Sequence, residues 1–181
     1  MLTADDILDF WYSEPINKHW FNSSSEIDSD IRQRFEGAWL KAQQGELDSW
    51  LDTAKGCLAL IILFDQLPLN MFRGEPESFS TEANAIEVTL HGIKQGFDQQ
   101  LPSSQLSFFY MPLMHSESIQ HQDLSVKMFE QAGFQNNLRF AQHHRELIAK
   151  FGRFPHRNAI LGRKSTTAEI EYLQSDQAFT G

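Results

Sequence analysis

The residues best suited to chemistry lie together near the carboxyl end of the chain, between positions 151 and 163. Three arginines, a histidine and an asparagine stand there among aromatic, glycine and proline residues, a composition typical of a rigid turn on a packed base. A guanidinium binds a carboxylate or phosphate through two parallel hydrogen bonds, and an imidazole titrates near neutral pH. The sequence therefore predicts a polar site for a small anion, with Arg153, Arg157, Asn158 and Arg163 as ligand-binding residues and His156 as a proton-handling candidate.

A second polar group follows the most apolar stretch of the chain, Leu58–Phe64. Asp65 shares a helical face with apolar residues of that stretch, so the pattern predicts a buried carboxylate. Such a group needs a cation or several hydrogen-bond donors. We expect either a structural salt bridge with an arginine of 151–163, which is favoured, or a catalytic role. The other ligand-binding candidates of this group are Gln66, Asn70 and Arg73. Gln66 and Asn70 have an alternative role, which is to donate hydrogen bonds to the free carbonyls at the end of the helix.

His115 is a second candidate for proton transfer. Ser116 is expected to cap the helix that follows, and Glu117, also a ligand-binding candidate, is expected in its first turn, where the helix dipole favours an acid. His115, Glu117 and His121 can be read as metal ligands. Their spacing matches neither a metalloprotease nor a di-iron motif, so no metal is assigned here and a metal site remains the weaker, third alternative.

His144 is the third candidate for proton transfer. It shares a helical face with Phe140, Leu147 and Ile148, and that face leads into the segment 151–163. We expect His144 to point at the base of that segment, either as a satisfied core residue or as part of the site.

Composition narrows the class of protein. The net charge of the 181 residues is −9, yet positions 139–164 hold seven Lys or Arg and one acid. An acidic body with one basic segment argues against nucleic-acid binding, which uses a broad basic face. No apolar run approaches the roughly 20 residues that cross a bilayer. No signal peptide, phosphate loop or other cofactor motif is present. We therefore expect a cytoplasmic protein without a cofactor, a membrane or a nucleic-acid partner, in which the single cysteine, Cys57, is a buried apolar residue.

Helical periodicity and capping signals run through nearly the whole chain, and no segment alternates as a strand does. Pro68 is expected to end the central helix, and Pro112 to break the helix that begins near Ser103. Helices of mixed length with short loops predict a single all-α domain, residues 1–181, of stacked antiparallel helical hairpins. The expected helices are 3–12, 25–45, 47–51, 53–67, 81–96, 103–110, 115–132, 136–152 and 166–173.

Three motifs, Leu63–Gly74, Met111–Glu117 and Phe151–Arg163, together resemble the DUF924 family of bacterial-type proteins. The resemblance covers nearly the whole chain and implies a tetratricopeptide-like all-α fold, but no activity. The family usually has an arginine where this chain has Leu69. The resemblance also implies that the family's motif set includes Asp65, Asn70, Arg73, His115, Glu117, His144, Arg153, His156, Arg157, Asn158 and Arg163.

These observations leave two hypotheses about function. The first is a binding protein or enzyme for an anionic metabolite, which the three arginines clamp while one of the three histidines moves a proton. The second is a tetratricopeptide-like interaction module with a protein partner, in which the polar cluster is an internal brace. The many aromatic residues do not separate the two, because aromatic side chains serve a core and an interface equally.

Overall fold

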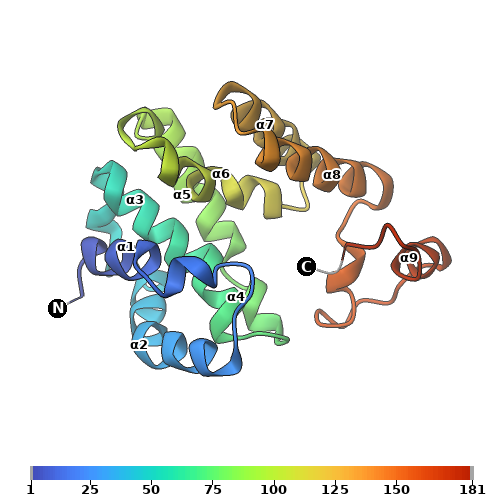
Figure 1. Ribbon diagram of the computed structural model, residues 1–181, viewed down its shortest axis with the longest axis horizontal. Helices are drawn as coiled ribbons and strands as arrows, with labels where there is room; N and C mark the ends of the chain where they lie inside the picture. The colour runs from blue at the N-terminus through green and yellow to red at the C-terminus, as the bar shows by residue number, and fades with distance from the viewer. Residues whose placement is uncertain (1, 180–181) are drawn as a thin grey trace. The chain divides into compact units, whose positions relative to one another are not determined.

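A computed structural model describes residues 2–179, whose regular secondary structure is all helical, with no strand among these residues (Figure 1). They divide into two compact units, residues 2–73 with 77–112 and residues 74–76 with 113–179. The prediction of a single domain over residues 1–181 stays a prediction. The α-helices are α1 (Ala4–Tyr12), α2 (Ser25–Gln43), α3 (Ala54–Ile61), α4 (Leu67–Met71), α5 (Glu82–Gln95), α6 (Ser103–His115), α7 (Ile119–Gln131), α8 (Gln135–Phe151) and α9 (Thr167–Leu173). A π turn occupies Ile62–Gln66, and short 3-10 helices occupy Ile16–Lys18, Asp48–Asp52, Pro76–Phe79, Asp98–Gln100 and Pro155–Arg157.

Four predicted helix ends are confirmed, each at a residue that caps its helix locally. The Thr3 hydroxyl accepts the Asp6 N–H at 3.2 Å, and the Asp6 carboxylate accepts the Thr3 N–H at 2.8 Å, which completes a capping box before α1. Thr166 forms the same box before α9, and the Thr53 hydroxyl accepts the Gly56 N–H before α3. Gly152 ends α8 in the left-handed conformation, at φ 71°, which a glycine adopts without strain.

The prediction that Pro68 ends the central helix is wrong. The helix passes through the π turn, where the Leu67 N–H donates to the Ile62 carbonyl, and continues as α4 to Met71. Pro68 has no N–H, so the Phe64 carbonyl four residues earlier loses its usual donor. The Thr81 hydroxyl donates to that carbonyl instead, at 2.7 Å. A side chain distant in sequence therefore allows the proline inside the helix.

The prediction that Pro112 breaks the helix is also wrong, because α6 continues to His115. A proline inside a helix costs about 3 kcal/mol. Phe108, Phe109 and Leu113 on either side are at most 1% exposed, and burying such side chains stabilises by roughly 1.5–3 kcal/mol each. Their burial outweighs the lost hydrogen bond.

One other helix begins later than predicted, and another begins earlier. Helix α7 begins at Ile119, so Ser116 and Glu117 lie in the connection before it and not at its first turn. Helix α8 begins at Gln135, one residue before the predicted start at 136.

In the first unit, α3 is the central helix and contacts α1 and α5, while α2 packs against α4. The segment Ala54–Met71 has a mean hydropathy of 1.2, enough for a candidate membrane span, but 83% of it is buried inside the protein. That burial is typical of the core helix of a soluble helical domain. Cys57, a residue of this helix, is fully buried as predicted, and burial raises the pKa of its thiol to about 11.

In the second unit, α7 and α8 form a hairpin, which Figure 1 shows in orange, and α9 contacts the 3-10 helix Pro155–Arg157. A small core of Leu147, Ile148 and Phe154 lies at the end of α8. Four partly buried residues pack against this core: Ile119, Phe151, Tyr172 and Phe179.

Candidate functional site

The segment 151–163 is a hydrogen-bonded turn, as its composition predicts. After Gly152 the chain forms a short 3-10 helix, in which the Asn158 N–H donates to the Pro155 carbonyl at 3.1 Å. The Arg163 N–H donates back to the Asn158 carbonyl at 2.8 Å. Phe154 anchors the segment, since its side chain is 0% exposed. The three arginines are thus presented by a rigid backbone in the second unit.

Arg153 is bound to a carboxylate of its own unit. Its Nε and Nη2 donate to the two oxygens of Glu169 at 2.7 and 2.8 Å, and Nη2 also donates to the Lys164 carbonyl. Glu169 accepts two further hydrogen bonds, from Asn158 Nδ2 at 3.2 Å and from the Thr166 N–H at 2.8 Å. The Arg153 hydrogen bonds are the main reason that the pKa of Glu169 is lowered to about 2. Glu169 is therefore ionised at neutral pH, and its carboxylate holds together Arg153, Asn158 and the start of α9 at Thr166.

Arg163 is bound in the same way to Glu117. Its two terminal nitrogens donate to the Glu117 oxygens at 2.7 and 2.9 Å, Nε donates to Asn158 Oδ1, and Nη2 also donates to the Phe154 carbonyl. Glu117 accepts the Phe154 N–H as well, at 2.8 Å. Burial opposes the ionisation of Glu117, but the hydrogen bonds from Arg163 and Phe154 outweigh it and hold its pKa below the usual value. The connection before α7 is thereby tied to the turn.

Arg157 is the most buried of the three arginines, at 6% exposed. Its guanidinium lies 4.7 Å from the centroid of the Phe154 ring, and Nη2 donates to the His115 carbonyl at 3.1 Å. Arg157 therefore links the end of α6 to the turn.

Two histidines of this unit, His144 and His156, lie against the same aromatic base. His144, predicted to point there, is 5% exposed, and its ring lies 5.4 Å from that of Phe154 and 4.6 Å from that of Phe179. Its Nδ1–H donates to the Phe140 carbonyl at 2.7 Å, because a carbonyl can only accept. Burial lowers the pKa of His144 to about 3. Burial, followed by the charge of Arg157, lowers the pKa of His156 to about 4. Both imidazoles are neutral at neutral pH.

The metal site at His115, Glu117 and His121 has no support in the structure. The Ser116 hydroxyl lies 2.9 Å from His121 Nδ1, and Glu117 is held by Arg163. Across residues 2–179, no group of three or more His, Cys, Asp or Glu side chains is arranged to hold a metal ion.

The polar group after the central helix lies in the first unit and is organised around Asp28. Asn70 Nδ2 donates to the Asp28 carboxylate at 2.8 Å, and Arg73 donates to both of its oxygens, at 2.6 and 3.2 Å. Asp65 and Gln66 are both buried in the π turn, and Gln66 Nε2 donates to Asp65. The expected salt bridge between Asp65 and an arginine of 151–163 would join the two units and stays a prediction.

Sequence reasoning missed three participants. Asp28, which was not among the predicted site residues, lies in the first turn of α2 and binds Arg73. Glu169 closes the capping box of α9 and is also the counter-ion of Arg153, which its sequence pattern does not indicate. Phe179, which packs on His144 and His156, has no local pattern that marks it.

The comparisons with known proteins agree with this fold. The family model described as "Bacterial protein of unknown function (DUF924)" matches residues 7–177. A solved structure of a protein of unknown function from Agrobacterium tumefaciens is 38% identical, with a TM-score of 0.89, over 94% of this chain and 96% of that chain. No curated protein matches the sequence. The match over nearly the whole chain shows that this protein belongs to the DUF924 family of bacterial proteins of unknown function.

Proposed function

We propose that this protein is an interaction module of stacked, tetratricopeptide-like helical hairpins, and that the polar cluster of its second unit is an internal brace. The observation that carries the proposal is the closed pairing of Arg153 with Glu169 and of Arg163 with Glu117. Both pairs are bidentate, the geometry in which an arginine would otherwise bind a ligand carboxylate or phosphate. A clamp for an anion needs these donors to be available.

The cost of opening the pairs supports the same conclusion. A ligand anion at Arg153 would replace hydrogen bonds that already exist, so it would gain little. It would also separate Glu169, which is 2% exposed, from its cation. Removing one partner of a buried ion pair costs roughly 3–5 kcal/mol, because the remaining charge is left without compensation. Binding at this position would have to offset that loss.

A substitution at Arg157 tests the brace. The Arg157→Ala variant should lose roughly 2–4 kcal/mol of unfolding free energy, because the His115 carbonyl loses a charged hydrogen-bond donor and the Phe154 ring loses a cation–π contact. Phosphate and dicarboxylates should leave the melting temperature of the wild-type protein unchanged. Arg139→Ala, at an exposed position of α8, is the matched control and should change stability by less than about 0.5 kcal/mol.

One observation favours the second candidate, a site for an anionic metabolite. The Nδ1 atom of His156 is buried and has no hydrogen-bond partner among residues 2–179, and the cationic Arg157 is its neighbour. Buried polar atoms usually have a partner, so a ligand atom would complete this site. In this candidate, the anion would be held at Arg157, and His115, His144 or His156 would handle the proton. An anion that raises the melting temperature of the wild-type protein but not of Arg157→Lys would establish it and would contradict the brace.

A further inference from the structure

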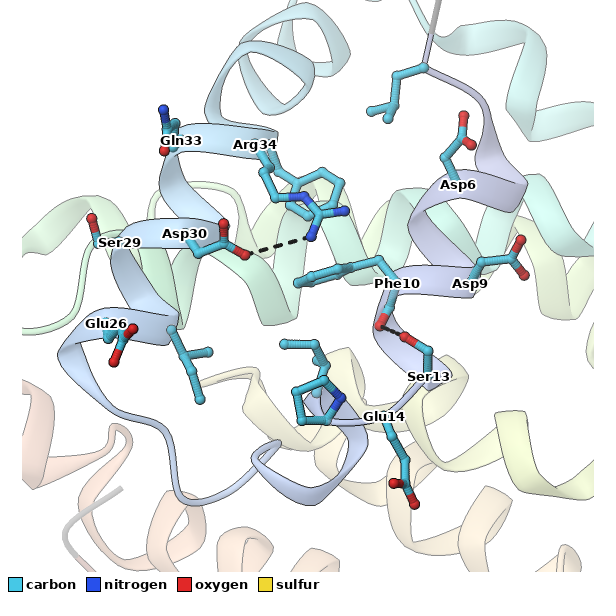
Figure 2. Close-up of a pocket in the computed structure, with 15 residues that line it drawn as sticks. Asp6, Asp9, Phe10, Ser13, Glu14, Glu26, Ser29, Asp30, Gln33 and Arg34 are labelled. Atoms are coloured by element: carbon cyan, nitrogen blue, oxygen red, sulfur yellow. Dashed lines mark hydrogen bonds and ion pairs between the residues drawn. The ribbon is translucent and has the colours of Figure 1, made fainter.

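An open groove of about 1330 Å³ lies between α1 and the first turns of α2, within the first unit (Figure 2). Its floor is apolar and is formed mainly by Phe10, Ile16 and Phe35. Ile27 and Pro15 extend the apolar surface toward the rim. Small-molecule sites usually measure roughly 300–1,000 Å³ and are enclosed, so the size of this groove suits a larger occupant.

Both walls of the groove carry carboxylates. Asp6 and Asp9 stand on α1, three residues apart, and Glu26 and Asp30 stand on α2, four residues apart. These spacings place each pair on one helical face, and Figure 2 shows the two pairs on opposite sides of the groove. With Glu14, the lining holds five acids and a single cation, Arg34.

Three of these acids, Asp6, Asp9 and Glu26, form no ion pair within the described part of the chain. Asp6 accepts hydrogen bonds from Thr3 at the start of α1, and all three side chains are exposed. Their charges are therefore available to a partner.

Arg34 illustrates how the groove holds a cation. Its guanidinium lies 4.4 Å from the centroid of the Phe10 ring and 5.2 Å from that of Phe35, and it pairs with Asp30 at 3.6 Å. An aromatic floor with an acid beside it is the arrangement that favours arginine or lysine through combined cation–π and ionic attraction.

We propose that this groove binds a basic amphipathic segment of a partner protein, with apolar side chains on the floor and Lys or Arg side chains against the two acidic walls. The inference rests on the proposed function and names the partner's chemistry. A helix of about ten residues, taken as a cylinder about 10 Å wide and 15 Å long, fills about 1,200 Å³, comparable to the groove. Nucleic acid and anionic lipid surfaces are repelled by the same carboxylates.

The experiment uses the full chain and a fluorescent peptide of about 14 residues, with leucines at helical spacing and lysines elsewhere. Fluorescence anisotropy measures its dissociation constant at about 20 and about 200 mM salt. We expect binding that weakens at the higher salt. Asp9→Lys/Glu26→Lys should weaken binding at least about 10-fold at low salt, because four unit charges change where the peptide sits.

Two controls separate the groove from the general acidity of the protein. Glu46→Lys/Glu87→Lys reverses the same number of charges at exposed positions of the first unit outside the groove, and should change the dissociation constant less than about 3-fold. A peptide with serine in place of leucine keeps the lysines and should bind at least about 10-fold more weakly. Equal effects of the two double variants, equal binding of the two peptides, or no binding at all would overturn the proposal.

Different outcomes would overturn the proposal for the groove and the proposal that the protein is an interaction module. If a partner protein binds the wild type and Asp9→Lys/Glu26→Lys equally well, the interaction module stands and the groove is overturned. If no partner binds either protein and the peptide does not bind, both are overturned.

Discussion

Replacing Glu169 with alanine is the perturbation for which the brace makes its most detailed prediction. The Thr166 N–H would lose its capping partner, which costs about 1 kcal/mol. The side chain of Asn158, which is 0% exposed, would keep its hydrogen bond to Ser165 but lose the one to Glu169, at a cost of about 1 kcal/mol. Arg153 is 27% exposed and can turn to water, so the loss of its two hydrogen bonds adds about 1 kcal/mol. The free energy of unfolding should fall by roughly 3 kcal/mol in total.

The assay must report on the second unit. All four tryptophans lie between positions 11 and 50, in the first unit, so tryptophan fluorescence does not report on α9. Amide hydrogen exchange does, and a loss of roughly 3 kcal/mol should speed exchange in α9 and the 151–163 turn by roughly 100-fold. Glu171→Ala, at an exposed position of α9, is the control and should leave exchange near the wild-type rate. If Glu169→Ala exchanges no faster than this control, the reasoning is refuted.

Two further predictions concern pH and the first unit. The pKa of His144 in the folded protein is lowered to about 3, whereas in the unfolded chain it is near 6.5. Between these values the unfolded chain binds a proton that the folded chain does not. The contribution of the neutral His144 to stability is therefore complete above pH 6.5 and is lost as the pH falls toward 3. Near pH 5, the free energy of unfolding measured with urea should change with pH less steeply in His144→Gln than in the wild type, by about 1.4 kcal/mol per pH unit. An unchanged slope would contradict the buried neutral imidazole. Thr81→Val should lower the unfolding free energy of the first unit by roughly 2–4 kcal/mol, because the hydroxyl binds both the Phe64 carbonyl and Trp39 Nε1. The exposed Thr167→Val is its control, and equal urea midpoints for the two variants would show that the Pro68 helix does not depend on Thr81.

The local part of the fold could be predicted from the sequence. The capping boxes at Thr3 and Thr166 and the glycine at 152 act within a few residues, so their patterns predict helix ends correctly. The prolines at 68 and 112 could not be placed in this way. Whether a proline ends a helix depends on which side chains satisfy the freed carbonyl or bury the neighbouring residues, and Thr81 is thirteen residues away from Pro68 in sequence.

The candidate site was predicted as a set of residue types more accurately than as a set of contacts. The turn at 151–163 and the position of His144 at its base followed from composition and helical period. The carboxylate partners could not be derived, because Asp28 and Glu169 each occupy a first helical turn, where an acid already has a local reason to be present. Only tertiary structure shows that each also holds an arginine.

The most direct test of the brace is a double-mutant cycle between Arg163 and Glu117. The unfolding free energies of wild type, Arg163→Met, Glu117→Gln and the double variant would be measured by urea denaturation. The two direct hydrogen bonds of this partly buried pair, at 2.7 and 2.9 Å, predict a coupling of about 1.5–3 kcal/mol. A coupling below about 0.5 kcal/mol would mean that the pair does not stabilise the fold, and would contradict the brace.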